Sequence, residues 1–148
     1  MRQNPTTGEL KPILLSHIHR LSNNEELTRL SDFGARLQDQ FIVHPKDTGI
    51  FYPRKISLTR TVGYLEFGEG TGVISEPQGS EIDLTRDDRY LLLATDGLCD
   101  CIDPKTLASL LKGSPQNCVQ NILDYLNTEV GATLDDTAII IKSLDGFI

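Results

Sequence analysis

The distribution of apolar residues along this chain predicts both strands and helices. Apolar residues run without interruption through Tyr90–Ala94 and through Ala138–Ile141, which predicts two strands buried on both faces. Shorter strands are expected at Leu10–Ser16, Phe41–Val43, Val73–Ser75 and Ser80–Leu84. Strands interspersed with separate helices are typical of an α+β fold.

Helix starts are marked by capping motifs. Ser22-x-x-Glu25 has the form of a capping box, and Gly34 is a natural end for the helix that follows. Two more helices are expected where a capping residue precedes proline, at Asp103–Pro104 and at Ser114–Pro115. The glycine-rich run Tyr64–Gly72 matches neither the Rossmann nor the P-loop pattern, so it is predicted to be a flexible linker.

Acidic residues stand at one end of each apolar strand. Asp96 follows Tyr90–Ala94, and Asp135 precedes Ala138–Ile141. If the strands are antiparallel neighbours, Asp96 and Asp135 converge at the same edge of a sheet. A buried carboxylate without partners costs on the order of several kcal/mol, and a hard cation is one way to satisfy it. Oxygen ligands without His or Cys suit magnesium or manganese. The alternative is a solvated Asp-Gly turn.

Composition and charge narrow the class of protein. The 148 residues are 39% hydrophobic and 24% charged, as in an ordinary globular domain or part of one. The net charge of −7 argues against a nucleic-acid surface, and no apolar run approaches the roughly 20 residues of a membrane span. The N-terminal residues lack the apolar core of a signal peptide. The three cysteines lack CxxC spacing, so reduced thiols in an intracellular, cytoplasmic or nuclear, location are expected.

Four segments carry more specific information than composition does. They are Leu58–Tyr64 (LTRTVGY), Ile74–Pro77 (ISEP), Asp87–Ile102 (DDRYLLLATDGLCDCI) and Leu134–Ile141 (LDDTAIII). In this order they resemble the metal-dependent serine/threonine protein phosphatases of type 2C, the PPM family, whose blocks are SRxxGD, xxEP, hhhASDGhWD and DNxT/S. Leu14–Leu37 is similar to the family's LTxDHxP…E..RI…GG segment, so the resemblance covers nearly the whole chain.

The resemblance implies a fold and a chemistry. The fold would be α+β, an antiparallel β-sandwich flanked by helices. Two manganese or magnesium ions would activate a water that hydrolyses phosphoserine or phosphothreonine in a phosphoprotein substrate, with no protein side chain as nucleophile. By motif match, Asp96 and Asp135 would be direct metal ligands. Asp100 would match the ligand that some members use for a third, weaker ion.

The sequence also departs from the family pattern. The acidic "ED" strand and the DGHGG turn, whose aspartate bridges both metals, are missing. Smaller departures are Tyr64 for the usual Asp, Cys99 for Trp and Asp136 for Asn. Residues 1–148 are therefore expected to be the C-terminal portion of a single type 2C catalytic domain, an incomplete sandwich that is inactive alone and has the N-terminal half as a partner. The alternatives are a pseudophosphatase-type interaction module without catalysis, and a structural acidic domain without metal.

Overall fold

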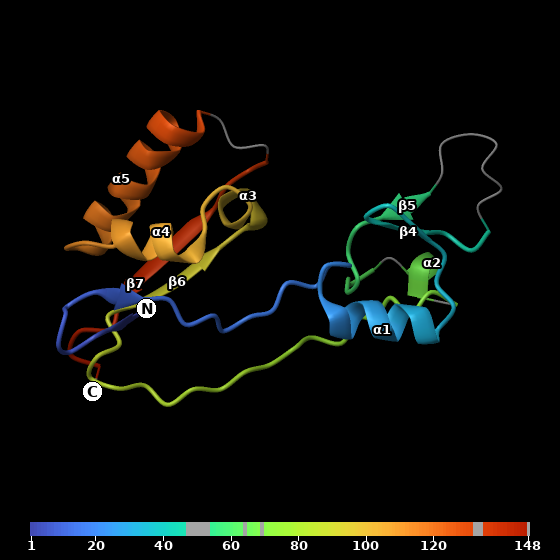
Figure 1. Cartoon of the computed structure of the whole chain (residues 1–148), viewed down its shortest axis with the longest axis horizontal. Coiled ribbons are helices and arrows are strands. Elements are labelled where there is room, and N and C mark those ends of the chain that lie inside the picture. The colour runs from blue at the N-terminus through green and yellow to red at the C-terminus, as the bar shows by residue number, and fades with distance from the viewer. Residues whose placement is uncertain (47–53, 64, 69, 132–134, 148) are drawn as a thin grey trace. The chain divides into compact units, whose positions relative to one another are not determined.

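The chain divides into two compact units in the computed structural model, which describes residues 1–46, 54–63, 65–68, 70–131 and 135–147 (Figure 1). The first unit combines Met1–Leu14 with Ile82–Ile148, and the second is Leu15–Glu81. The first unit contains β1 (Arg2–Gln3), β2 (Leu10–Lys11), β6 (Tyr90–Ala94), α3 (Asp96–Cys99), α4 (Pro104–Leu110), α5 (Pro115–Tyr125), the π-helical turn η1 (Leu126–Val130) and β7 (Ile139–Ser143). The second contains α1 (Asn24–Asp32), β3 (Leu37–Gln38), β4 (Phe41–Val43), β5 (Lys55–Ile56) and α2 (Leu65–Gly68).

Both predicted proline-initiated helices are present in the first unit. The Asp103 carboxylate accepts hydrogen bonds from the backbone N–H groups of Lys105 and Thr106 at the start of α4. The Ser114 side chain accepts from the Asn117 N–H at the start of α5. Each cap satisfies N–H groups that the first helical turn leaves unpaired, so the local sequence determines where both helices begin.

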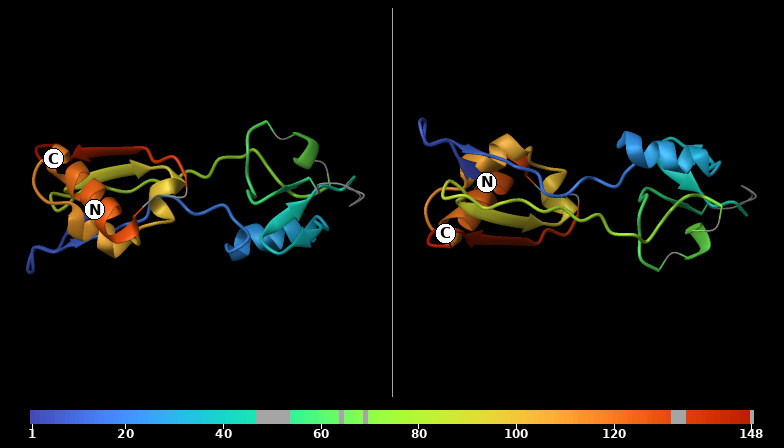
Figure 2. Two further views of the ribbon diagram at one scale, coloured as in Figure 1. Left: turned by 90° about the horizontal axis from the view of Figure 1, so that it is seen from above. Right: turned by 90° about the horizontal axis from the view of Figure 1, so that it is seen from below.

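Strands β6 and β7 form a two-stranded antiparallel ribbon in which Tyr90 pairs with Ser143 and Ala94 with Ile139 (Figure 2). One face of the ribbon packs into the core of the unit, whose buried members are Tyr90, Leu98, Ile102, Leu107, Leu111, Cys118, Ile122 and Leu126. On the opposite face, Leu93, Ile140 and Lys142 are exposed, and Leu91 is half-buried.

The sequence analysis predicted that both strands are buried on both faces, but the opposite face of the ribbon is largely exposed. Leu93 and Ile140 are directly paired across the ribbon, and they are 56% and 66% exposed. The prediction was wrong for the described chain because α4 and α5 belong to the core on one face only. The second strand also begins at Ile139 instead of Ala138.

The hairpin of β1 and β2 is tied to the residues that precede β6. Arg2 donates from Nε and Nη2 to the two carboxylate oxygens of Asp88, at 3.0 and 2.8 Å. These bonds from Arg2 lower the pKa of Asp88 to about 2, although burial acts in the opposite direction. Strand β2 is shorter than the predicted Leu10–Ser16 and ends before Pro12, which lacks the N–H that a ladder requires.

The second unit is built on helix α1 and a small antiparallel sheet of order β3-β4-β5. Its buried apolar side chains are Leu30, Ile42, Val43, Phe67 and Val73. Helix α1 is capped by Asn23, whose side chain accepts from the Glu25 N–H at 3.0 Å, so the cap lies one residue after the predicted Ser22. Gly34, at φ 73°, follows the helix as expected.

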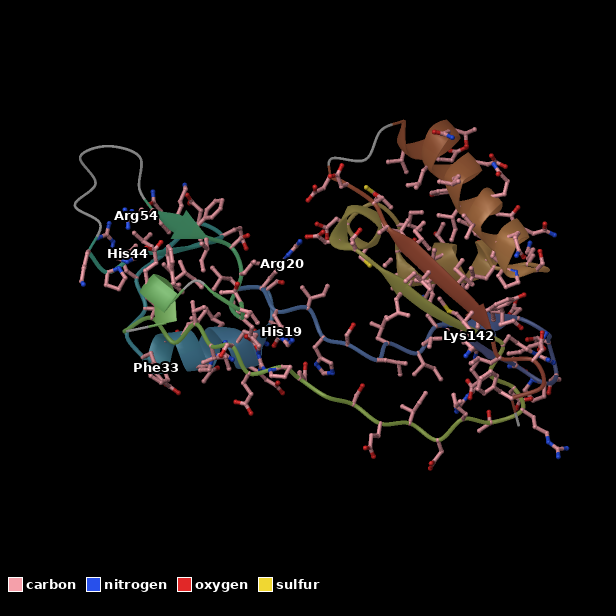
Figure 3. All side chains as sticks on the ribbon, turned by 180° about the vertical axis from the view of Figure 1, so that it is seen from behind. His19, Arg20, Phe33, His44, Arg54 and Lys142 are labelled. Carbon is pink, nitrogen blue, oxygen red and sulfur yellow. The ribbon has the colours of Figure 1, made fainter. Side chains whose placement is uncertain are left out.

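A buried carboxylate, Glu26, joins α1 to the segment after β5. Its side chain is 1% exposed and lies within 2.6 Å of Arg29 Nη2 and 2.7 Å of Arg60 Nη2. Thr59 Oγ1 donates to it at 2.6 Å, and Nδ1 of His19, labelled in Figure 3, lies 3.4 Å from Oε1. Burial alone would raise the pKa of Glu26, but the bonds from Arg29, Arg60 and Thr59 outweigh it and hold the pKa well below its usual range.

Three local sequence predictions between Tyr64 and Leu84 are wrong. Leu65–Gly68 forms the short helix α2, and Phe67 is buried, so the described part of Tyr64–Gly72 is not a flexible linker. Val73–Ser75 and Ser80–Leu84 form no ladder; Ile74 makes only an isolated bridge with Arg60. An apolar run becomes a strand only when a partner strand is available, and none of the described strands lies beside these segments.

Candidate metal site

The two acidic strand ends predicted from the sequence lie at the same end of adjacent strands. Strand β6 runs into Asp96, and Asp135 lies shortly before β7. The ladder ends with Ala94 opposite Ile139, so the chain leaves β6 where it enters β7. The predicted convergence of the acidic segments is therefore confirmed.

Thr95 links the two acidic segments by hydrogen bonds, just beyond the last residue pair of the β6–β7 ladder. Its N–H donates to the Ala138 carbonyl at 3.1 Å. Its hydroxyl donates to the Asp136 carbonyl at 3.1 Å and accepts from the Ala138 N–H at 3.0 Å. One threonine thus satisfies backbone groups of the opposite segment that a regular ladder would have paired.

Gly97 permits a close approach between the segments. A Cβ atom at this position would lie 2.6 Å from the Asp136 carbonyl oxygen, 2.7 Å from Thr137 Oγ1 and 2.9 Å from the Asp135 carbonyl oxygen. Glycine is required here because any side chain would displace backbone, and the φ angle of Gly97 is not the reason. The Asp-Gly sequence after β6 consequently serves close packing of the two acidic segments.

The acidic side chains of this edge face solvent. Asp96, Asp100, Asp135 and Asp136 are all exposed, so the expected desolvation of Asp96 does not occur in the described chain. The Asp136 N–H donates to Asp135 Oδ1 at 2.7 Å, which orients that carboxylate.

The pKa of the Cys99 thiol is raised, in part by the negative charge of this edge. Desolvation raises it, and the charges of Asp100 and Asp96 add to the increase. Asp100 lies one helical turn after Asp96, and its N–H donates to the Asp96 carbonyl at 2.8 Å. The α3 turn therefore places both carboxylates near the Cys99 thiol.

The donor chemistry of this edge fits a hard divalent cation, and the number of donors falls short of a full site. Carboxylate and carbonyl oxygens are the ligands that magnesium and manganese prefer. Within the described ranges, however, no group of three or more His, Cys, Asp or Glu side chains is arranged to hold a metal ion. Asp96, Asp135 and Asp100 could thus hold a cation only together with further ligands.

Sequence reasoning located the acidic residues and missed two features of the edge. The contacts of Thr95 and Gly97 with the 135–138 segment were not predicted. The signal was present in the small Thr-Asp-Gly sequence at a strand end, because glycine there permits close backbone approach. Glu26 was also missed as a buried ion-pair centre; Arg60 within an apolar segment was the available hint.

The chain is similar in sequence to known proteins of one family. The sequence profile of the family described as Protein phosphatase 2C matches residues 6–127. The chain is 26% identical over 119 residues to "Probable protein phosphatase 2C 13" of Arabidopsis thaliana, covering 73% of this chain and 28% of that protein. It is 26% identical over 131 residues to "Protein phosphatase 2C homolog 1" of Saccharomyces cerevisiae, covering 87% of this chain and 42% of that protein.

Solved structures show the same likeness in the fold. The serine-threonine phosphatase 2C from Toxoplasma gondii aligns with a TM-score of 0.69 at 19% identity, covering 96% of this chain and 50% of that chain. The chain spans less than half the length of the two curated relatives named above. No helix in the described part of the chain is long and apolar enough to cross a membrane.

Proposed function

Since the chain belongs to the protein phosphatase 2C family, we propose that it supplies one half of the metal site of a protein serine/threonine phosphatase. Asp96 and Asp135 are the proposed direct ligands of manganese or magnesium, and Asp100 the proposed ligand of a further, weaker ion. The substrate class would be phosphoserine or phosphothreonine in a protein.

The close packing at Gly97 is the observation that supports this proposal most. Backbone oxygens of the 135–136 segment lie within 2.9 Å of where a Cβ would stand, so the two acidic segments act as one structural unit. A solvated turn needs no such approach. Divalent ions held there would lower the pKa of water and neutralise phosphate charge, which is the usual contribution of metals to phosphoester hydrolysis.

The remaining ligands are proposed to come from a complementary half of the domain. The exposed face that carries Leu93 and Ile140 ends at the same edge as Asp96. An apolar partner surface placed on that face would bring its own residues beside the acidic edge. Burial of this face and completion of the ligand set would then occur in one step.

Metal binding to the chain itself can be tested with manganese, which broadens nearby NMR signals. We expect millimolar-range manganese to broaden the amide signals of residues 95–100 and 135–138 before others, because two or three carboxylates form only a weak site. Asp96→Asn should reduce this selective broadening. Asp124→Asn is the matched control, since Asp124 is an exposed aspartate on α5. Broadening spread evenly over all acidic residues would contradict the site.

Activity requires the complementary half. Joined to the part of the Toxoplasma phosphatase that it does not cover, the chain should hydrolyse p-nitrophenyl phosphate in the presence of manganese. Asp96→Ala or Asp135→Ala should abolish that hydrolysis, and Asp124→Ala should preserve it. A chimera that unfolds cooperatively and binds manganese but is inactive would instead favour the interaction module. Hydrolysis by the chain alone that depends on Asp96 would overturn the half-site assignment.

A further inference from the structure

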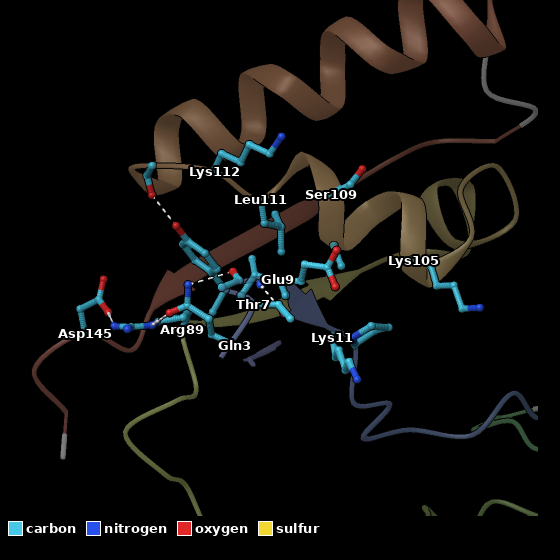
Figure 4. A pocket seen from close by; sticks show the side chains of 16 residues that line it. Gln3, Thr7, Glu9, Lys11, Arg89, Lys105, Ser109, Leu111, Lys112 and Asp145 are labelled. Atoms are coloured by element: carbon cyan, nitrogen blue, oxygen red, sulfur yellow. Dashed lines mark hydrogen bonds and ion pairs between the residues drawn. The ribbon is translucent and has the colours of Figure 1, made fainter. Parts of the chain in front are cut away.

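A groove in the first unit lies apart from the acidic edge. It has a volume of about 1290 Å³ and runs between α4 and the β1–β2 hairpin (Figure 4). Three buried apolar residues, Tyr90, Ala108 and Leu111, line it, and the Tyr90 hydroxyl donates to the Gly113 carbonyl at 2.6 Å. Tyr90 begins β6 and Asp96 follows its end, so at about 3.3 Å per residue the Tyr90 end of the groove lies roughly 20 Å from Asp96.

Lysines dominate the charge of the groove. Lys11 comes from β2, Lys105 from the first turn of α4, and Lys112 from the loop that follows α4. All three side chains are exposed, and none has a carboxylate of the described chain within ion-pair distance. Unpaired ammonium groups around one groove attract an anionic ligand.

The two carboxylates that also line the groove do not cancel this charge. Asp145 is engaged by Arg89 Nη1 at 2.9 Å, which neutralises that pair. Among the residues that line the groove, Glu9 then remains against three lysines, and Asp103, which does not line it, interacts electrostatically with Lys105. The whole chain has a net charge of −7, so the groove carries the sign opposite to that of its molecule. A positive groove on a negatively charged chain favours anionic ligands at this place and not elsewhere on the surface.

We propose that this groove binds an extended acidic peptide segment. Its volume exceeds the roughly 300–1,000 Å³ of typical small-molecule pockets, and an open trough of this kind accommodates several residues of extended chain. Carboxylates of the peptide pair with Lys11, Lys105 and Lys112, and its apolar side chains contact the Tyr90 end. The acidic edge at Asp96 repels the same peptide, which restricts it to the groove. The proposal does not depend on phosphatase activity.

The chain's six lysines provide a matched test. One variant replaces Lys11, Lys105 and Lys112 by glutamate, and the control replaces the other three, Lys46, Lys55 and Lys142, which are also exposed. Both variants change the net charge equally. The probe is a fluorescent peptide of alternating glutamate and serine, compared with the same peptide carrying glutamine for glutamate, and binding is followed by fluorescence anisotropy.

The wild-type chain should bind the glutamate peptide, more weakly as salt rises, and should not bind the glutamine peptide. The groove variant should weaken binding by about tenfold or more, equivalent to 1.4 kcal/mol, while the control variant leaves it nearly unchanged. In the wild-type chain, the peptide should shift the amide signals of Tyr90, Leu111 and Gly113 and leave those of residues 95–100 in place, a readout that needs no variant.

Four results would overturn the proposal. They are equal weakening in both lysine variants, equal binding of the glutamine peptide, absence of binding to the wild-type chain, and peptide shifts located at residues 95–100. A single-stranded oligonucleotide that competes at equal concentration and depends on the same lysines would replace the peptide by a nucleic acid as the occupant.

Discussion

At the scale of single residues, Glu26 has the largest expected effect on stability. Its carboxylate is 1% exposed and satisfies Arg29 and Arg60, which are themselves mostly buried. Removing one partner of a buried ion pair leaves the others uncompensated, so Glu26→Gln should lower the free energy of unfolding of the second unit by about 3 kcal/mol. Urea unfolding, followed through amide signals of Leu30 and Ile42, measures this.

Neighbouring Glu25 supplies the control for that substitution. It lies on the same helix with an exposed side chain, so Glu25→Gln should change stability by only a few tenths of a kcal/mol. Because the folded-state pKa of Glu26 is lowered, its stabilising contribution is complete above the ordinary value of 4.5 and is lost as pH falls below it. Glu26→Gln should remove that acid dependence, and an unchanged dependence would contradict the ion-pair account.

The sequence predicted the positions of some functional residues and missed others. Asp96 and Asp135 were placed correctly because each lies within three residues of an apolar run. In antiparallel neighbours, the end of one strand lies beside the start of the other. Glu26 was missed because Thr59 and Arg60 lie 33 and 34 residues away from it. Their pairing depends on how the segment after β5 returns to α1, which no local pattern specifies. The metal-ligand roles of Asp96, Asp135 and Asp100 stay predictions.

At the scale of elements, the junction between α3 and the segment before β7 depends on Gly97. In Gly97→Ala the added Cβ would lie within 2.9 Å of two backbone oxygens, so one segment must move. Overpacking of this kind costs about 1–3 kcal/mol, and thermal unfolding of the first unit measures it. Gly79→Ala is the control, because nothing lies within 4 Å of its Cβ position. Equal effects of the two substitutions would contradict the packing account.

Elements with local start signals were predicted best. Helices α4 and α5 begin where Asp103 and Ser114 precede proline, since capping needs only the neighbouring N–H groups. Strands depend on partners distant in sequence, and the predicted strands Val73–Ser75 and Ser80–Leu84 have no partner strand among the described residues, where Ile74 makes only an isolated bridge with Arg60. The α+β class was predicted correctly because it depends only on which types of element are present and how they are interspersed.

At the scale of the whole molecule, the outer face of the β6–β7 ribbon is expected to control self-association. Leu93 and Ile140 form an exposed apolar cross-strand pair, with Phe147 also 60% exposed. Exposed apolar strand faces favour association between chains. The chain should therefore sediment as larger species as its concentration rises. The double substitution Leu93→Ser with Ile140→Ser should shift the sedimentation profile toward monomer, because it replaces both apolar side chains of this cross-strand pair by polar ones.

Leu123 supplies the matched control for the ribbon. It is a large apolar side chain, 42% exposed, on α5. Leu123→Ser should leave the concentration dependence nearly unchanged if the ribbon face is the associating surface. The ribbon variant should also bind a complementary half of the domain less tightly, because the same face would be buried in both associations. A ribbon variant that stays monomeric yet binds that half with unchanged affinity would show that the domain is completed through a different surface.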